Sequence, residues 1–218
     1  MDNWLLGTGR GIYQSPDGWN WTRMAEYDYG ITALAFGSQG ILAACGSGLW
    51  QVLPHDAMWV QMHDETLTEV MDIACVDGGK GLVAASAYGV ATGSRTEDGV
   101  MRWRWHSDDL PVDARFTNAI VVDTPERWLI GTEAGVLVTE DGGDVWQWTS
   151  LVGVAVRGLY FEQGCWWACA DNGFWKSDLG VSWERAGKGL ADVVVFDAAV
   201  MEDSVVLGTE DGVWCGDG

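Results

Sequence analysis

Residues Leu129–Leu137 read Leu-Ile-Gly-Thr-Glu-Ala-Gly-Val-Leu, which is an apolar run, a tight turn containing glycine, and a second apolar run. Two short apolar segments joined in this way are typical of a β-hairpin, because glycine readily adopts the positive φ that such turns require. The same pattern occurs six times along the chain. The six turn glycines are Gly11, Gly48, Gly89, Gly135, Gly173 and Gly212.

Successive turn glycines are separated by 37 to 46 residues. Between hairpins the pattern continues with a tryptophan-containing segment, such as 103–105, a polar loop, and another apolar segment, such as 70–76. Each repeat therefore predicts four short antiparallel strands, with almost no helical periodicity. Four-stranded units of about 40 residues are typical of propeller blades. The sequence predicts an all-β protein in which residues 1–218 form a single β-propeller domain.

The link between the third and fourth predicted strands carries a second recurring motif. Residues 139–146 read Thr-Glu-Asp-Gly-Gly-Asp-Val-Trp, and residues 96–103 read Thr-Glu-Asp-Gly-Val-Met-Arg-Trp. Segment 15–21 is one residue shorter, segment 177–183 has its serine displaced, and Cys215-Gly-Asp-Gly218 begins the motif. Segment 53–59 keeps only the tryptophan.

These segments resemble the Asp-box, or BNR, motif Ser/Thr-x-Asp-x-Gly-x-Thr-Trp of sialidases, sortilin-type receptors, xyloglucan-cleaving hydrolases and photosystem II assembly-factor propellers. The resemblance covers nearly the whole chain. It implies that the boxes lie at the periphery, away from the functional face, where the Asp accepts hydrogen bonds from its own turn and the Trp packs over the hairpin. The residues given this structural role are Asp17, Trp21, Asp98, Trp103, Asp141, Trp146, Asp178, Trp183 and Asp217.

The strand order of Asp-box propellers divides the chain into blades. In that order, residues 31–62, 69–106, 116–150 and 156–186 form four complete blades, while 4–24 and 193–218 supply three strands each. We expect six blades that are incomplete at the seam. The alternative is five blades, with residues 19–24 as the outer strand of the last one. Unpaired strand edges at the seam would favour self-association or a partner protein.

The charge and composition narrow the classes of partner. The chain has 32 acidic and 12 basic residues, a net charge of −20, so it repels phosphate groups. We therefore expect no nucleic acid and no membrane among its partners. The N-terminal residues lack the basic and apolar regions of a secretory signal, which favours a cytoplasmic location.

Cysteine and histidine spacing predicts no metal and no cofactor. The five cysteines show no C-x-x-C pair, and the three histidines are far apart in sequence. Small buried free thiols explain the cysteines better than disulfides or a zinc site.

Catalysis is not the favoured hypothesis. Arg10 is followed by Gly-Ile, so the Arg-Ile-Pro of sialidases is absent, and no arginine triad is evident on the predicted inner strands. A glycosidase needs only two carboxyl groups about 5–9.5 Å apart. With 32 acidic residues such a pair can always be proposed, so the acidic residues alone do not decide whether the protein is an enzyme.

Acidic residues do gather in the loops that lead into the inner strands and in the turns between second and third strands. They are Asp28, Asp64, Glu65, Asp108, Asp109, Asp113, Glu133, Asp171, Glu210 and Asp211. The leading hypothesis is a non-catalytic protein-interaction or scaffold propeller that presents these residues as an acidic loop face. Two alternatives stay open, a carbohydrate-binding or glycoside-hydrolase-like propeller and a structural scaffold without a ligand. Trp19, Trp166 and Trp167 have no assigned packing role and keep the glycan alternative open.

Overall fold

The computed structural model describes residues 4–26, 30–37, 40–53, 58–76 and 81–216. In these ranges the chain is all-β, with 22 strands and one turn of 3₁₀ helix, η2 (Val112–Ala114). Within these ranges, no helix has the length and apolar character needed to cross a membrane. The chain divides into two compact units, Met1–Trp105 and His106–Gly218.

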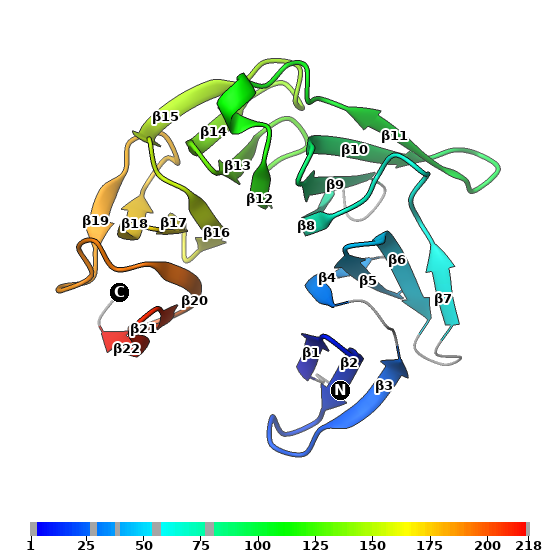
Figure 1. The fold of residues 1–218 in the computed structure, drawn as a ribbon, viewed down its shortest axis with the longest axis horizontal. Coiled ribbons are helices and arrows are strands. Elements are labelled where there is room, and N and C mark those ends of the chain that lie inside the picture. Colours follow the sequence, from blue (N-terminus) through cyan, green and yellow to red (C-terminus); the bar gives the residue numbers. More distant parts are fainter. Residues whose placement is uncertain (1–3, 27–29, 38–39, 54–57, 77–80, 217–218) are drawn as a thin grey trace. The chain divides into compact units, whose positions relative to one another are not determined.

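The first unit contains three antiparallel sheets (Figure 1). Blade 1 has three strands: β1 (Trp4–Thr8), β2 (Gly11–Ser15) and β3 (Thr22–Glu26). Blade 2 has four strands: β4 (Ile31–Gly37), β5 (Gly40–Cys45), β6 (Gly48–Leu53) and β7 (Met58–Gln61). Blade 3 has β8 (Val70–Val76), β9 (Gly81–Ser86), β10 (Gly89–Arg95) and β11 (Met101–Trp105).

The second unit also contains three sheets. Blade 4 has β12 (Thr117–Val122), β13 (Trp128–Thr132), β14 (Gly135–Thr139) and β15 (Gln147–Val152). Blade 5 has β16 (Val156–Glu162), β17 (Cys165–Ala170), β18 (Gly173–Ser177) and β19 (Glu184–Ala186). Blade 6 has three strands: β20 (Val195–Met201), β21 (Ser204–Thr209) and β22 (Gly212–Gly216).

Every sheet is a meander in which each strand pairs with the next one along the chain. The all-β propeller fold with six blades, three-stranded at each end of the chain, is thereby confirmed. The five-blade alternative is wrong, because β3 pairs with β2 in the first blade instead of closing the last one. The expectation that residues 1–218 form one domain stays a prediction.

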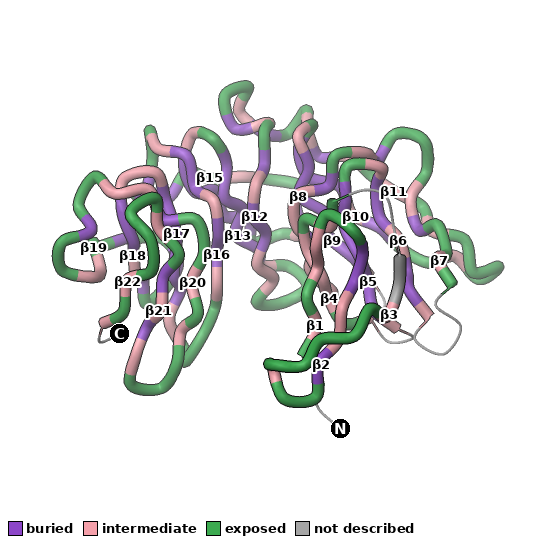
Figure 2. Tube along the Cα trace, turned by 60° about the horizontal axis from the view of Figure 1, so that its bottom comes forward, coloured by how far each residue is buried: buried purple, intermediate pink, exposed green. Residues whose placement is uncertain are grey.

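Each core lies between neighbouring blades, and the second strand of a blade contributes to two of them. On β5, Ile41 and Ala43 pack towards blade 1, whereas Leu42 and Ala44 pack towards blade 3. On β17, Trp166 and Ala168 face blade 4 while Trp167 and Cys169 face blade 6. Because successive side chains alternate between faces, burial on both faces requires a continuous apolar run. Figure 2 shows these central strands as the most buried part of each blade.

Glycine on the second strand allows the next blade to approach closely. A Cβ atom on Gly131 would lie 2.8 Å from Cγ1 of Val156, the first residue of β16. In blade 1 the corresponding strand is β1, where a Cβ atom on Gly7 would lie 2.6 Å from Cγ2 of Ile31 at the start of β4. A larger residue at either position would push the neighbouring inner strand away.

The turn between second and third strands has its own hydrogen-bonding pattern. In blade 4, Oγ1 of Thr132 donates to the carbonyl of Gly135 at 2.9 Å and accepts from the backbone N–H of Ala134 at 3.1 Å. The first of these bonds recurs in the pairs Thr8–Gly11, Ser86–Gly89 and Thr209–Gly212, and with a thiol donor in Cys45–Gly48. Blade 5 differs, since Ala170 has no hydroxyl group to donate.

Two turn glycines provide a matched test of this geometry. Gly135 and Gly212 both have positive φ (137° and 110°), but a Cβ atom on Gly135 would lie 2.4 Å from the Leu151 carbonyl oxygen, whereas one on Gly212 would meet nothing within 4 Å. We expect Gly212→Ala to cost about 1–2 kcal/mol of unfolding free energy from backbone strain alone. Gly135→Ala should cost more than about 3 kcal/mol, because the clash adds to the strain. Thermal unfolding followed by circular dichroism measures the stability of both variants. Equal losses of unfolding free energy would contradict the close approach of Gly135 to the Leu151 carbonyl.

Candidate functional site

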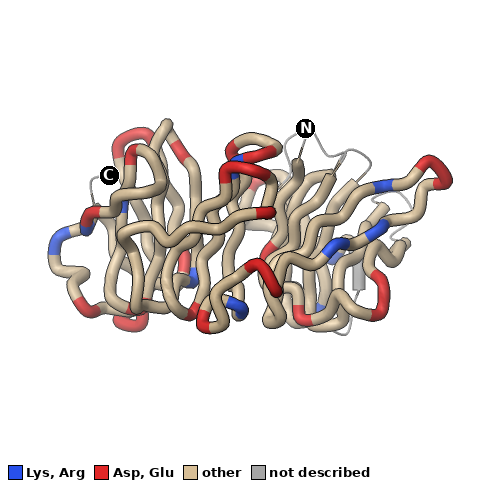
Figure 3. Tube along the Cα trace, turned by 90° about the horizontal axis from the view of Figure 1, so that it is seen from above, with Lys and Arg blue, Asp and Glu red and all other residues tan. Residues whose placement is uncertain are grey.

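The described acidic residues that were predicted to form a face lie at one edge of blades 3 to 6, where the connection into the inner strand meets the turn between second and third strands. Backbone hydrogen bonds join these two segments: Glu133 N–H donates to Phe116 C=O, Asp171 N–H to Ala155 C=O, and Glu210 N–H to Val194 C=O. We call this the loop edge of a blade. Figure 3 shows Asp and Glu gathered in loops and turns.

The structure assigns the described residues among them to blades 3 to 6 and the connections that lead into these blades. Asp64 and Glu65 lie between β7 and β8 in the first unit. Asp108, Asp109 and Asp113 lie on the segment that leads into β12, Glu133 and Asp171 in the turns after β13 and β17, and Glu210 and Asp211 in the turn after β21. Asp28 lies outside the described residues, as does Asp217.

One arginine joins two of these carboxylates across neighbouring blades. Nε and Nη2 of Arg157, on β16, each donate to a carboxylate oxygen of Asp171 at 2.8 Å, and Nη1 donates to Oε1 of Glu133 at 3.1 Å. Asn118 on β12 also donates to Oε1 of Glu133, at 3.0 Å. The hydrogen bonds from Arg157 to Asp171 raise the pKa of the guanidinium. This bidentate, cross-blade arrangement stabilises blade 5 at the turn that lacks a hydroxyl group.

Two other predicted acids stabilise their own loops. Oε1 of Glu210 accepts from the backbone N–H of Val194 at 2.9 Å. Asp64 accepts from the hydroxyl of Thr66 at 2.6 Å and from its backbone N–H at 2.9 Å. The hydroxyl of Thr66 is the main reason that the pKa of Asp64 is lowered.

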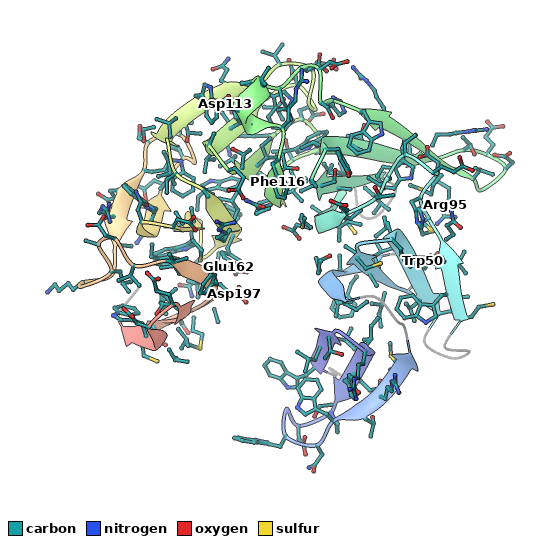
Figure 4. The ribbon with its side chains drawn as sticks, in the orientation of Figure 1. Trp50, Arg95, Asp113, Phe116, Glu162 and Asp197 are labelled. Atoms are coloured by element: carbon teal, nitrogen blue, oxygen red, sulfur yellow. The ribbon has the colours of Figure 1, made fainter. Side chains whose placement is uncertain are left out.

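The segment between β11 and β12 carries the acids that project from the molecule. The Asp108 side chain is fully exposed, 3.6 Å from Nη2 of Arg115, and that of Asp109 is partly exposed. Asp113 is an exposed residue of η2, and Figure 4 labels it with Phe116 on the same segment. His106 anchors the beginning of this segment, because its buried ring packs edge-on against Trp128 with centroids 6.3 Å apart. Glu65 and Asp211 are also exposed.

A pair of inner-strand residues was not predicted from the sequence. The hydroxyl of Tyr160, on β16, donates to Oδ1 of Asp197 on β20, which is labelled in Figure 4. Burial raises the pKa of Tyr160 far above its ordinary value, with smaller contributions from Cys169 and Asp197, so the phenol stays protonated and acts as a donor. Burial likewise raises the pKa of the neighbouring Cys169 thiol. The pair therefore joins two inner strands and offers no nucleophile.

No metal centre is evident in the ranges that the structure describes: no three His, Cys, Asp or Glu side chains are arranged to hold an ion. The two tryptophans without an assigned role on β17 are core residues, since Trp166 and Trp167 are almost fully buried. Trp19 differs, because 88% of its surface is exposed.

The links between third and fourth strands form compact turns, which we call the box turns (residues 15–21, 96–103, 139–146 and 177–183). In segment 139–146, Oδ1 of Asp141 accepts from the Thr139 hydroxyl at 2.8 Å and from the backbone N–H groups of Asp144 and Val145 at 3.1 and 2.9 Å. The Trp146 indole then donates to the Gly143 carbonyl at 3.0 Å. The turn is therefore closed by its own side chains.

Asp17 and Asp98 have related roles in their turns. Oδ1 of Asp17 accepts from the backbone N–H groups of Trp19 and Asn20 at 2.9 and 2.8 Å, and the indole of Trp21 donates to the Gly18 carbonyl. The bond from the Asn20 backbone is the largest cause of a pKa far below the usual range at Asp17. Asp98 accepts from the hydroxyl of Thr96, which lowers its pKa. Trp103 instead donates to Met62 C=O of blade 2, at 2.8 Å.

Asp178 does not have this role. Oγ of Ser177 accepts from the Gly180 N–H at 2.8 Å, as Ser15 does from Gly18 at 2.9 Å, so the serine is in its expected place and was not displaced. The carboxylate is the group that is displaced, because Leu179 occupies the position that corresponds to Asp17. The Leu179 side chain is 74% exposed. Trp183 is buried, and its indole N–H has no hydrogen-bond partner among the residues that the structure describes.

No protein-family model matches the chain, and no curated protein sequence matches it. Similar solved structures do exist. One is the extracellular domain of the putative one-component system BT4673 of B. thetaiotaomicron, with a TM-score of 0.78, 13% identity, and 98% of this chain covering 30% of that one. PorZ, described as an essential bacterial surface component of the type-IX secretion system of Porphyromonas gingivalis, has a TM-score of 0.77, 14% identity, and 99% of this chain covering 37% of that one.

A third similar structure is the β-propeller domain of Cps50 (Swd1) from Myceliophteria thermophila, with a TM-score of 0.75 and 14% identity, in which 99% of this chain covers 80% of that one. The chain spans about a third of the length of the BT4673 and PorZ chains. At these identities the likeness establishes the propeller fold alone.

The box turn of blade 5 suggests a stabilising substitution. Leu179→Asp would supply the missing acceptor for the backbone N–H groups of Val181 and Ser182, as Asp17 does in blade 1. We expect a gain on the order of 1 kcal/mol, comparable to a helix N-cap, or roughly 2–4 °C in thermal midpoint at pH 7. The pKa values of Asp17, Asp98 and Asp141 are lowered in the folded state, so the new aspartate should behave likewise. Its stabilisation should be complete above about pH 4 and disappear as the pH falls further.

Leu179→Ala is the matched control, because it removes the same exposed side chain without adding an acceptor. Thermal melts of both variants between pH 3 and pH 7 measure the difference. Identical midpoints at pH 7, or a gain that is as large at pH 3 as at pH 7, would show that the new carboxylate does not close the turn.

Proposed function

We propose that the chain is an Asp-box propeller that serves as a non-catalytic protein-interaction module, with the acidic segment 106–116 as the contact surface. Three box turns support the Asp-box assignment, because Asp17, Asp98 and Asp141 each accept hydrogen bonds within their own turn. The partner protein would carry a positively charged surface. Nucleic acid and anionic membranes are disfavoured by the net charge of −20.

The interaction hypothesis rests on a difference between two groups of loop-edge acids: some are hydrogen-bonded within the fold, and others are exposed. Glu133, Asp171 and Glu210 are used in hydrogen bonds that hold blades and loops together. Asp108 and Asp113, in contrast, are exposed on one short segment. Exposed carboxylates that gather on one short segment are suited to steering a cationic partner.

The arrangement of Glu133 and Asp171 also supports a non-catalytic role. A glycosidase of either stereochemical class needs one carboxyl group to donate a proton. Here both carboxylates accept from the guanidinium of Arg157, at 2.8 to 3.1 Å, so each is committed to an ion pair.

A cytoplasmic location is part of the same proposal. All five cysteines are free thiols, and Cys45 and Cys169 are buried, as expected for a protein of a reducing compartment. The descriptions of the BT4673 domain and PorZ assign those proteins to the outside of the cell or its surface. The comparisons therefore do not support this part of the proposal.

Neutralising the aspartates of segment 106–116 tests whether this segment is the contact surface. The triple variant Asp108→Asn/Asp109→Asn/Asp113→Asn should weaken binding of a fluorescent lysine-rich peptide roughly threefold to tenfold at low salt. The control Glu97→Gln/Glu126→Gln/Glu202→Gln changes the net charge equally, at turns away from the loop edge. Fluorescence anisotropy at two salt concentrations measures both. If the two variants weaken binding equally, binding depends only on the net charge of the protein, and segment 106–116 is not the contact surface.

A carbohydrate-binding role is the second candidate, and one observation favours it. Trp19 and Trp4 are 88% and 63% exposed in blade 1, and Nε1 of Trp4 lies 3.8 Å from the position that a Cβ atom of Gly18 would take, next to Trp19. Exposed indole rings are suited to stacking on sugars.

Under this alternative, Trp19→Ala should abolish any signal of the protein on a glycan array while leaving its thermal midpoint unchanged. Phe196→Ala is the control, because that side chain is also exposed, at 53%, but lies in blade 6. An array without any signal from the unaltered protein would rule the carbohydrate alternative out.

A further inference from the structure

Blade 6 has an outer edge without a strand in the described part of the chain. In blades 2 to 5 the third strand is covered by a fourth, namely β7, β11, β15 or β19. In blade 6 the third strand, β22, is the last one of its sheet. Among the described strands, none pairs with the outer side of β22, and its backbone N–H and C=O groups can pair with another extended segment.

A cavity of about 430 Å³ lies between blades 5 and 6 beside this edge. Its lining includes Trp214 and Gly216 of β22 and Ala186 of β19. Trp167 and Phe174, whose stacked rings are 5.2 Å apart at an interplanar angle of 10°, line the blade 5 side. Aromatic rings from both blades therefore line the cavity.

In blades 2 and 3, a tryptophan occupies the corresponding place. Trp103 of the outer strand β11 packs on the core between these blades and donates to the carbonyl of Met62, which follows the box tryptophan Trp59 by three residues. In blade 5 the residue three after the box tryptophan Trp183 is Ala186, which lines the cavity. The cavity therefore lies where an outer strand of blade 6 would place its tryptophan.

The charge of the lining is opposite to that of the protein. Lys176, Arg185 and Lys188 line the cavity together with a single acid, Glu184, although the chain has only 12 basic residues against 32 acidic ones. Nζ of Lys176 lies 4.8 Å from the centroid of the Trp167 ring. Within the described ranges, no carboxylate is at ion-pair distance from Lys176 or Lys188, whereas Arg185 lies 3.8 Å from Asp192. An acidic segment is the complementary occupant.

We infer that blade 6 binds an extended, acidic, tryptophan-bearing segment of a partner protein, which adds to β22 as a fourth strand. The backbone of the segment pairs with the edge of β22, a tryptophan fills the cavity against Trp214 and Phe174, and its acidic side chains lie near Lys176 and Lys188. This site does not depend on the acidic segment 106–116, since the two surfaces select partners of opposite charge.

A peptide with the sequence of residues 139–152 of this chain is a suitable probe, because it is itself an outer strand with three acidic residues and two tryptophans. Labelled with fluorescein, it should bind the full-length protein saturably in fluorescence anisotropy. Replacing both tryptophans with alanine should abolish binding. Strand addition uses the N–H groups of alternate residues. Two N-methylated versions, modified at odd or at even positions, should therefore differ, one binding like the parent peptide and the other not at all.

The protein variant Lys176→Gln/Lys188→Gln should weaken binding roughly threefold to tenfold and reduce its salt dependence. Arg102→Gln/Arg104→Gln is the matched control, since it removes two exposed charges from another outer strand, β11. Absence of saturable binding, equal binding of the two N-methylated peptides, or equal effects of the two variants would overturn the inference. So would a dimer in sedimentation that the peptide dissociates, which would assign the edge to a second copy of the chain.

Discussion

The rest of the structure depends on one packing constraint: in blades 2 to 5, the second strand is buried on both of its faces. On β17, alternate residues belong to the core with blade 4 and to the core with blade 6. A polar residue in the middle of such a strand would lie in one core or the other, so the apolar run cannot be interrupted. The same constraint explains Gly131, which leaves room for Val156 where the next blade comes closest.

Polar side chains are consequently restricted to the ends of the strands, where most of them serve the turns. Thr132 closes the turn after the second strand, and Asp141 closes the turn after the third. Arg157 does the same over a longer distance, since it reaches from an inner strand to carboxylates of two blades. A large share of the charge that the loop edge carries is therefore structural. Other acids, among them Asp108 and Asp113 of segment 106–116, remain exposed.

Much of the fold could be predicted because its determinants are local in sequence. The turn glycines and the apolar runs between them define hairpins within about ten residues, and their period defines the blades. The contacts of Arg157 could not be predicted in this way, because Glu133 and Asp171 come to the same guanidinium only once blades 4 and 5 are packed together. The hydrogen bond from Tyr160 to Asp197 likewise depends on two inner strands that are 37 residues apart in sequence.

The box turn of blade 5 illustrates a different limit. From its sequence alone, segment 177–183 suggests that Asp178 occupies the aspartate position of the Asp-box motif and that Ser177 is displaced. The structure shows the reverse, because Ser177 ends β18 as Ser15 ends β2, and the strand end sets the register of the turn. The cavity beside β22 could not be located from the sequence, because its lining combines residues of blades 5 and 6 that are far apart along the chain.

The meander in each blade has a consequence for how the chain folds. Every strand pairs with its neighbour in sequence, so each sheet can form from one contiguous stretch of chain without waiting for a distant segment. Docking of one finished blade on the next then adds a core of its own, as in a linear array of repeats. Cooperativity in such an array passes from neighbour to neighbour. Blades 1 and 6, with three strands each, would then be the places where unfolding begins, and the central blades would exchange their amide hydrogens last.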